Sequence, residues 1–554
     1  MVTAETFDYV IVGAGSAGCV LADRLTESGQ DSVLLLEYGG SDRSVWIQMP
    51  SALNIPLNMP RYDWRYYTEP EPNLNNRRLH TPRGKVLGGS SSINGLVYVR
   101  GNPLDFERWE TQGAAGWGYG DVLPYFRRAE AYAGGGNDYR GADGKLATRR
   151  GLLDNPLHAA WLSAGREAGY PYSADMNGFQ QEGLAHMDMT VGNGRRCSAA
   201  NAYLRPAMRR PNLAVRTHAL AIAVQFAGRR AIGVRYQRGG AAHAARVRRE
   251  VIVCAGSINS PQLLKLSGVG PGGELAALGI ATVHDLPGVG ENLQDHLEFY
   301  FQVASREPVT LYSQMSLWRR ALIGARWLLT HDGLGASNHF ETGGFIRSRA
   351  GVRYPDIQFH FLPLAVSYDG SSLAREHGFQ AHVGPMRSQS QGSVRLRSAA
   401  PTDKPIISFN YMSRAEDWLE MRACVRLTRE IFAQPAFDRY RGREIQPGEP
   451  VRTDEEIDAF IREKVESAYH PSCTCKMGSV SDPMAVVDKE ARVIGVEALR
   501  VVDSSIMPSI TTGNLNAPTI MLAEKAADHI RGRSLLPRAS APYYIAPEWE
   551  GRQR

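Results

Sequence analysis

The histidine at position 470 is the residue of this chain best suited to acid–base chemistry. It lies in the segment 468–478, where Pro471 fixes the backbone after it and where the pattern is that of a loop. A histidine titrates near neutral pH, so it can take the proton of an alcohol while a hydride leaves the adjacent carbon. A histidine before a proline is more often a structural or surface residue, and the context alone leaves that alternative open.

A glycine pattern at the N-terminus indicates dinucleotide binding. A β-branched run ends at Gly13, Gly15 and Gly18 in G-x-G-x-x-G spacing, a helical pattern follows, and a second apolar run ends in Glu37. Gly13 permits the tight turn, Gly15 lets the backbone approach a pyrophosphate, and Gly18 lets helix and sheet pack closely. The pyrophosphate would sit at the helix N-terminus and Glu37 would accept from the ribose hydroxyls. Nicotinamide and flavin dinucleotides share this pattern.

Other polar residues are candidates with ordinary alternatives. Asn514 and Asn516 precede the last helical pattern, where each could be a helix cap. Asp503 suits either a turn or a cofactor contact. Glu298 would be a costly buried charge unless a cation pairs with it, and the alternative is simple surface exposure. The glycine- and serine-rich segment 83–95 offers free backbone N–H groups to an anion or a polar ring edge, and its apolar residues argue against a mobile linker.

The elements that must position these residues form an α/β pattern. A strand at 251–256 leads into a helix, for which Pro261 would mark the start and Gly268 the end. The runs 213–218, 221–226 and 231–236 predict antiparallel strands.

The later part of the chain has a different character. Residues 297–475 predict a mixed α/β cap over the reactive end of the cofactor, with strands at 357–362 and 393–396. Pro518 suits the first turn of a last helix and Gly532 the position just past its end.

Composition bounds the function classes. The 554 residues exceed one hydrophobic core, so we expect two or more domains. With 63 basic and 57 acidic residues, the net charge of +6 is too small and scattered to indicate nucleic-acid binding.

The six cysteines form neither a disulfide framework nor a zinc-ligand pattern, so we expect a reducing compartment and no metal. We find no signal peptide and no span of about 20 apolar residues. We therefore expect a cytoplasmic protein, at most peripheral on the inner face of the cell membrane.

Five separated segments together resemble one family along nearly the full length. They are the N-terminal glycine pattern, residues 84–94, residues 256–270, and the blocks around His470 and Asn514. Their order and length are typical of the glucose–methanol–choline (GMC) flavin oxidoreductases. Within this family the chain is most similar to the bacterial dehydrogenases that oxidise choline, through strings at 68–72, 286–298, 335–341, 409–413, 440–445 and 482–488.

The resemblance implies a role for each matching residue. His470 would accept or stabilise the alcohol proton, with Asn514 as its partner at the flavin. FAD would be held by Gly13, Gly15, Ser16, Gly18, Glu37, Gly88, Gly89, Ser90, Asn94, Gly95, Val97, Asp503, Asn514, Ala517 and Pro518. Glu298 would face the quaternary ammonium of the substrate, and His360 and Tyr469 would lie beside it.

The chain departs from the family pattern at three places. Related choline oxidases attach FAD covalently through a histidine where this chain has Ile93, so we predict non-covalent FAD. An aromatic residue of the choline cage has no counterpart in residues 49–56. Cys473 stands where a glycine is expected, close to His470.

The resemblance thus implies an α/β fold with a Rossmann-like FAD-binding domain (residues 1–155, 196–296 and 480–535). An α+β substrate-binding domain would hold 156–195 and 297–479, and 536–554 would form a C-terminal tail. The expected reaction is oxidation of choline to betaine aldehyde, and further to glycine betaine, by hydride transfer to flavin N5. The alternatives are a family member acting on uncharged aliphatic or aromatic alcohols and a flavin-binding protein without catalysis. The electron acceptor, a respiratory quinone or oxygen, and the oligomeric state stay open.

Overall fold

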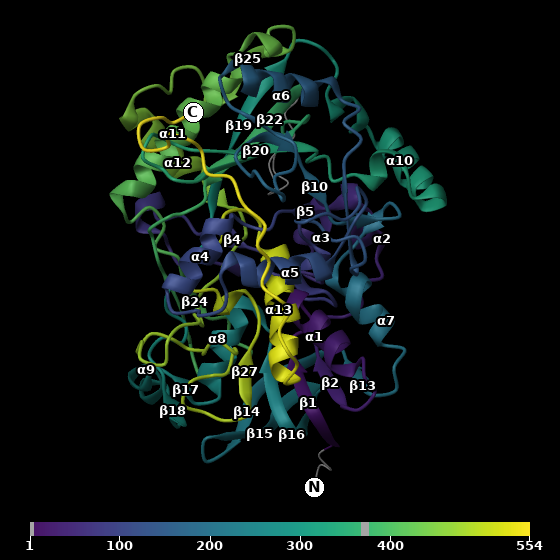
Figure 1. The fold of residues 1–554 in the computed structure, drawn as a ribbon, viewed down its shortest axis with the longest axis vertical. Coiled ribbons are helices and arrows are strands. Elements are labelled where there is room, and N and C mark those ends of the chain that lie inside the picture. Colours follow the sequence, from purple (N-terminus) through teal and green to yellow (C-terminus); the bar gives the residue numbers. More distant parts are fainter. Residues whose placement is uncertain (1–4, 367–375) are drawn as a thin grey trace.

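Two large β-sheets organise the molecule, one at each end of its long axis (Figure 1). The computed structural model describes residues 5–366 and 376–554. The N-terminal strand belongs to the lower sheet, and the chain passes between the two halves several times before the C-terminus ends at the upper half.

The lower sheet has seven strands and carries the predicted dinucleotide pattern. In spatial order they are β13 (Leu213–Arg216), β2 (Val33–Leu36), β1 (Glu5–Val12), β16 (Ala241–Val253), β15 (Arg230–Arg238) and β14 (Ala219–Ala227), with β27 (Leu499–Val501) beside β16. Strands β13, β2, β1, β16 and β27 run parallel, and β14 and β15 are antiparallel neighbours. The prediction of an antiparallel strand at 213–218 is therefore wrong. The pattern of apolar residues along a strand indicates which of its faces is buried, but it does not indicate whether the neighbouring strand runs parallel or antiparallel.

Three long helices are associated with this sheet: α1 (Ser16–Thr26), α8 (Gly256–Leu266) and α13 (Asn516–Ile530). Helix α8 begins at Gly256, so the prediction that Pro261 marks its start is wrong. Proline lacks the N–H that would bond the carbonyl four residues earlier. That carbonyl, of Ser257, instead accepts from the Thr474 hydroxyl at 2.6 Å. The predictions for α13 are confirmed, because Pro518 lies in its first turn and Gly532 follows its end at φ +61°.

The upper sheet has eight strands with two chemically different faces. It comprises β25 (Arg441–Gln446), β19 (Leu297–Ser305), β22 (Gly378–Pro385), β21 (Ile357–Leu362), β20 (Thr342–Ile346), β9 (Gly183–His186) and β8 (Tyr172–Ser173), with β26 (Glu466–Ser467) beside β19. One face carries phenylalanines such as Phe359 and Phe379, which pack with α6 (Pro156–Glu167) and α11 (Ala415–Phe432). Because side chains alternate along a strand, the polar residues between them point to the other face. The predicted strand at 357–362 is confirmed.

Further helices and small sheets lie between and around the two large sheets. They include the helices α2 (Val45–Gln48), α3 (Asn54–Leu57), α4 (Pro103–Thr111), α5 (Tyr119–Ala129), α7 (Arg205–Ala207), α9 (Gly272–Ala277), α10 (Leu317–Thr330) and α12 (Asp454–Lys464). A four-stranded sheet joins β5 (Val97–Tyr98), β10 (Asp188–Met189), β7 (Leu146–Arg150) and β6 (Glu130–Tyr132), and β23 (Ser393–Arg395) pairs with β24 (Ile406–Ser408), as the sequence predicts for 393–396.

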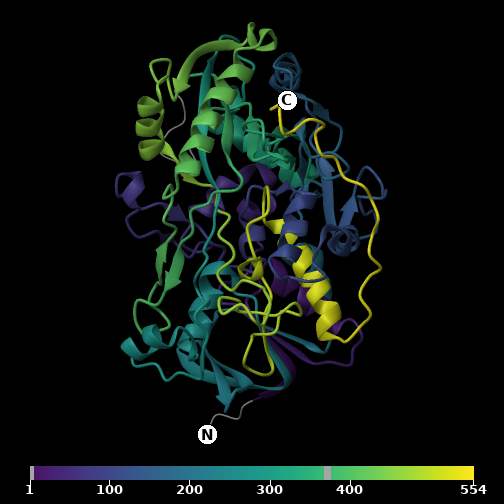
Figure 2. The ribbon, with the colours of Figure 1, turned by 60° about the vertical axis from the view of Figure 1, so that its left-hand side comes forward.

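The C-terminal tail runs along the surface from the lower half to the upper half (Figures 1 and 2). The backbone N–H of Ala539 donates to Gly120, and that of Tyr544 donates to Phe179. At its end, Arg554 forms an ion pair with Glu430 of α11. Within residues 5–366 and 376–554, none of the helices combines the length and the apolar composition needed to cross a bilayer.

Candidate active site

A cavity of about 500 Å³ brings together most of the residues that the sequence singles out. Its lining includes Gly13, Gly15, Ser16, Glu37, Gly89, Ser90, Asn94, Gly95, Val97, Glu298, His360, Tyr469, His470, Asp503 and Asn514. These residues come from both large sheets and from the loops between them. The cavity therefore joins a nucleotide-type cradle to a polar surface of the upper sheet.

Four of the predicted cofactor residues do not line the cavity. Gly18 lies against the turn, where an added Cβ would come within 1.9 Å of the Gly13 carbonyl oxygen. The backbone N–H of Gly88 donates to the Ala14 carbonyl at 2.7 Å. Ala517 and Pro518 are buried in the first turn of α13. These four residues therefore lie behind the residues that line the cavity.

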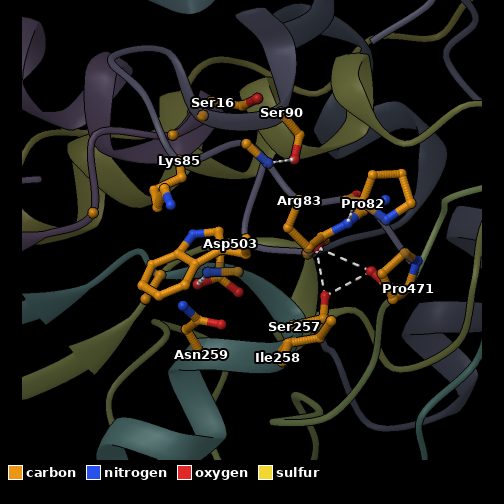
Figure 3. Close-up of a pocket in the computed structure, with 18 of the residues that line it drawn as sticks. Ser16, Pro82, Arg83, Lys85, Ser90, Ser257, Ile258, Asn259, Pro471 and Asp503 are labelled. Carbon is orange, nitrogen blue, oxygen red and sulfur yellow. Dashed lines mark hydrogen bonds between the residues drawn. The ribbon is translucent and has the colours of Figure 1, made fainter. Parts of the chain in front are cut away.

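The glycines make a cradle that side chains would fill. Gly13 has φ +100°, and an added Cβ would meet the Cys254 carbonyl oxygen at 2.5 Å. A Cβ on Gly89 would come within 2.7 Å of the Gly15 Cα, so the two glycine-rich segments touch. In Figure 3, Ser16 and Ser90 lie on one side and Ser257 and Asn259 on the other, with Asp503 between them. This arrangement fits a dinucleotide whose pyrophosphate approaches the backbone closely.

Two carboxylates secure the cradle. Glu37 accepts from the backbone N–H groups of Ala14 (2.9 Å) and Gly39 (2.7 Å), and burial raises its pKa to about 7. Asp503 accepts from the Gly256 N–H at 2.9 Å and from the Ser260 hydroxyl at 2.6 Å. Asp503 thereby holds the start of α8 while it lines the cavity. Both oxygens of Glu37, and Oδ1 of Asp503, which accepts from the Ser505 N–H, each have a second lone pair for a ribose or other donor.

Neither candidate asparagine caps α13, so the capping interpretation is wrong for both. No side chain caps this helix, which begins at Asn516. The Asn516 side chain accepts from the Ser16 hydroxyl at 2.8 Å and so links α13 to α1. Asn514 faces the histidines described below. The first turn of α13 opens on the cavity through Asn516 and Thr519, so its N-terminal dipole is available there.

The loop that carries His470 is held by buried charges. Tyr469 has φ +66°, a backbone conformation that residues other than glycine rarely adopt. Asp295 accepts from the His470 N–H at 2.7 Å and from the Ser467 hydroxyl at 2.5 Å. Arg83 donates to the Tyr469 carbonyl. These contacts offset the strain and fix the imidazole relative to the cavity.

Hydrogen bonds determine which nitrogen of His470 carries the proton. His296 Nε2 faces the Met386 carbonyl oxygen at 3.1 Å, and a carbonyl oxygen only accepts. Neutral His296 therefore has its proton on Nε2 and a lone pair on Nδ1, which lies 3.1 Å from His470 Nδ1. His470 must then donate from Nδ1, which leaves Nε2 without a proton. Asn514 Nδ2 lies 3.2 Å from that Nε2 and donates to it.

The orientation of Asn514 is fixed in the same way. Its Oδ1 accepts from Gln358 Nε2 at 3.1 Å and lies 3.3 Å from His360 Nε2, so its amino group must face His470. Burial, followed by the fields of His296, His360 and Arg83, holds the pKa of His470 well below its usual range. Residue 470 therefore presents a neutral imidazole whose Nε2 carries no proton and can accept one, as a general base requires.

We expect the buried histidines to make the protein sensitive to acid. Burial lowers the pKa of His296 to about 3 and that of His360 to about 4, so the unfolded chain binds protons that the folded chain excludes below pH 6.5. Stability then falls as pH drops through this range, by about 1.4 kcal/mol per pH unit for each histidine. Urea unfolding between pH 7 and pH 5 measures the slope. The double variant His296→Gln/His360→Gln should reduce the slope by about 2.7 kcal/mol per pH unit, while His470 and the other histidines with lowered pKa keep their contribution. An unchanged slope contradicts the assignment.

Glu298 belongs to a polar network on the cavity face of the upper sheet. Its carboxylate lies 3.1 Å from His382 Nδ1, and only 12% of its side chain is exposed, so the surface-exposure alternative is wrong. The backbone N–H of Val366 donates to Gln380 Oε1, which leaves Gln380 Nε2 to donate to His382 Nε2 at 2.8 Å. His382 therefore has its proton on Nδ1 and donates it to Glu298.

Asp295, His296, Phe340, Gln358, Gln380 and His382 are site residues that the sequence reasoning did not single out. A signal for some of them was present: Gln358 and His360, and likewise Gln380 and His382, alternate with aromatic or small apolar residues. Polar residues at every second position of a buried strand indicate a polar site on one face. Phe340 lines the cavity, whereas the segment 49–56, where no aromatic residue was found, contributes the aliphatic Leu53, and Leu57 follows just after it.

Comparison with known proteins identifies the family of the chain. Two family models described as GMC oxidoreductase match residues 7–298 and 388–523. The chain belongs to the GMC oxidoreductase family. It is 58% identical over 547 residues to the oxygen-dependent choline dehydrogenase of Brucella suis biovar 1 (strain 1330), which covers 99% of this chain and 100% of the relative. It is 57% identical over 551 residues to the enzyme of the same name from Photobacterium profundum, covering 99% and 97%.

Solved structures confirm the GMC fold. Pyridoxine 4-oxidase from Mesorbium loti superposes with a TM-score of 0.85 at 30% identity, covering 95% of this chain and 100% of that one. Formate oxidase of Aspergillus oryzae RIB40 superposes with a TM-score of 0.90 at 26% identity, covering 96% and 99%. Among the described residues of the present GMC chain, no cluster of three or more His, Cys, Asp or Glu side chains is arranged to hold a metal ion.

Proposed function

We propose that this GMC oxidoreductase binds FAD without a covalent bond and oxidises choline to betaine aldehyde. The observation that carries the proposal is that one cavity holds a dinucleotide cradle, a neutral histidine with an unprotonated Nε2 and a little-exposed glutamate. The relatives that are 57–58% identical over nearly the whole chain are named choline dehydrogenases, which supports the substrate.

The residues present fit FAD. Gly13, Gly15 and Gly89 leave room for a pyrophosphate, Glu37 can accept from the ribose, and the first turn of α13 offers a positive dipole to a ring that gains negative charge. When bound, FAD would supply the acceptor for a hydride. Ile93 lines the cavity and offers no nucleophile, which supports non-covalent binding.

The role of His470 follows from its hydrogen bonds. Its Nε2 would take the hydroxyl proton of the alcohol, and the resulting positive charge on the imidazole would be shared through Nδ1–H with His296. Asn514 would turn its amide toward the substrate oxygen and position it beside Nε2. Oxidation of an alcohol carbon is easier as the hydroxyl proton leaves, because negative charge on the oxygen favours departure of the hydride.

Glu298 would select a cationic substrate. A trimethylammonium group has no N–H to donate, so charge and aromatic faces must hold it. The Glu298 carboxylate supplies the charge, and Phe340 and Tyr469 line the same cavity. His382 and Gln380 keep the carboxylate oriented through their relay of hydrogen bonds.

An uncharged aliphatic or aromatic alcohol is the second candidate substrate. Leu53, from the segment where the choline cage of related oxidases has an aromatic residue, and the neighbouring Leu57 give the cavity an aliphatic wall. For the electron acceptor, the words oxygen-dependent in the relatives' names support oxygen, and a respiratory quinone is the alternative.

An anaerobic reduction assay tests the proposal. Purified holoprotein is mixed with choline, butanol or benzyl alcohol without air, and the flavin absorbance is followed. We expect choline to bleach the flavin at least about tenfold faster than either uncharged alcohol at equal concentration, because Glu298 binds only the cation. Air is then admitted, and prompt recovery of absorbance would support oxygen as the acceptor. A flavin that stays oxidised with every alcohol would overturn catalysis, and faster bleaching by butanol would overturn the choice of choline.

A further inference from the structure

Helix α10 (Leu317–Thr330) exposes a large apolar surface that the proposed reaction does not use. The exposed fractions are 83% for Leu317, 61% for Trp318, 58% for Leu322, 60% for Leu328 and 84% for Leu329. Figure 1 shows α10 projecting at one edge of the molecule. Large apolar side chains are rarely concentrated in this way on a monomer surface unless a partner covers them.

The exposed apolar residues fall on one side of the helix. At about 100° per residue, they occupy an arc of about 140°. The arc holds Leu317, Trp318, Ala321, Leu322, Ala325, Leu328 and Leu329. The opposite side carries Trp327, which is 1% exposed. The helix therefore has an apolar face toward solvent as well as an anchor toward the protein.

Arginines border the apolar arc on both edges. Arg320 lies about 60° beyond one edge, and Arg326 and Arg319 lie about 40° and about 60° beyond the other. The helix contains no aspartate or glutamate. Arg326 pairs with Asp332 just past the helix end at 2.7 Å, and both side chains are more than half exposed. The pattern of a wide apolar face between cationic edges is that of helices that lie in the plane of a membrane surface.

Trp327 fixes the helix to the body of the protein. Its ring packs with Met49, Ala52 and Ala336, and its Nε1 donates to the Gly194 carbonyl at 2.7 Å. Ala52 ends the 3₁₀ turn Pro50–Ala52, and the next residue, Leu53, lines the cavity. Trp327 thus packs helix α10 against the segment that forms the aliphatic cavity wall.

We propose that α10 docks this protein on an anionic lipid bilayer, with the apolar arc inserted at the headgroup boundary and the arginines on lipid phosphates. A second copy of the chain fits this face less well. Both edges carry only arginines, so two such helices packed face to face would bring arginine against arginine whichever way they run. Anionic headgroups complement both edges at once.

Vesicle sedimentation tests the proposal on the full-length holoprotein. The probes are vesicles of mixed phosphatidylglycerol and phosphatidylcholine, and vesicles of phosphatidylcholine alone. We expect the wild type to sediment with the anionic vesicles, and its partition coefficient to fall at least about tenfold in Leu322→Glu/Leu329→Glu. Arg319→Gln/Arg320→Gln/Arg326→Gln should weaken binding to anionic vesicles, as should high salt.

The matched control is Leu152→Glu/Val480→Glu, which changes two side chains that are 67% and 74% exposed outside α10. We expect this variant to bind vesicles like the wild type, and every variant to keep turnover of the soluble alcohol substrate. Equal sedimentation of the wild type and Leu322→Glu/Leu329→Glu would overturn the proposal. So would a wild type that binds no vesicles and is a dimer by light scattering, with the α10 variant a monomer, because the face would then belong to a second copy.

Discussion

Replacement of His470 by glutamine lowers the rate of anaerobic flavin reduction by choline about 100- to 10,000-fold, the range that loss of a general base produces. Glutamine keeps a polar group near Asn514 but offers no basic nitrogen of comparable strength. The flavin content should stay at the wild-type level, because the cradle formed by Gly13, Gly15 and Gly89 does not depend on the imidazole. Stopped-flow reduction and the absorbance ratio of flavin to protein measure the two quantities.

The pH profile gives an independent check on His470. Its pKa lies well below the usual value because of burial and the neighbouring His296 and His360. A base acts only when it is deprotonated, so kcat/KM should stay level as pH falls through about 6.5 and should decline only at lower pH. His243→Gln, a variant of a histidine stacked on Tyr236 in the lower half, is the matched control and should behave like the wild type. Full activity in His470→Gln would end the acid–base assignment.

Glu298→Gln raises KM for choline about 30-fold or more, with a smaller effect on kcat. Removing the charged partner of an enclosed cation weakens the binding free energy by about 2 kcal/mol or more, and every 1.4 kcal/mol changes the dissociation constant about tenfold. The amide keeps the shape and still accepts from His382, so the loss reports the charge and not the packing. KM and kcat from initial rates over a range of choline concentrations measure both effects.

A neutral isostere separates charge recognition from damage to the site. For 3,3-dimethylbutan-1-ol, which replaces the ammonium nitrogen by carbon, KM should be the same in Glu298→Gln and in the wild type. Glu307→Gln changes a more exposed glutamate just after β19 and should leave both substrates unaffected. If KM for choline is unchanged in Glu298→Gln, the cation site lies elsewhere. If KM rises equally for choline and for the neutral isostere, Glu298 is a structural residue.

Much of the nucleotide half could be predicted from the sequence, because its determinants are local. The strand, the turn at Gly13, helix α1 and the strand ending at Glu37 follow one another in the chain, and Gly18 packs against the carbonyl oxygen of Gly13, five residues earlier. Pro518 and Gly532 likewise mark the ends of α13 through short-range geometry. Cys473 shows the limit of this reasoning: its φ of +74° explains why glycine is expected there, yet this chain keeps a cysteine.

The family, the glycine cradle and His470 as the candidate base could be identified from motifs that are continuous in the chain, since these depend on residue types at fixed short spacings. The tautomer of His470 and the burial of Glu298 depend instead on contacts between segments that are far apart in the chain. His296 is 174 residues from His470, and His382 is 84 residues from Glu298. Glu298 and His382 meet because β19 pairs with β22, and His296 and His470 meet because the Ala468 N–H donates to the His296 carbonyl and joins the two segments. Pairing over such separations leaves no short-range trace in a single sequence.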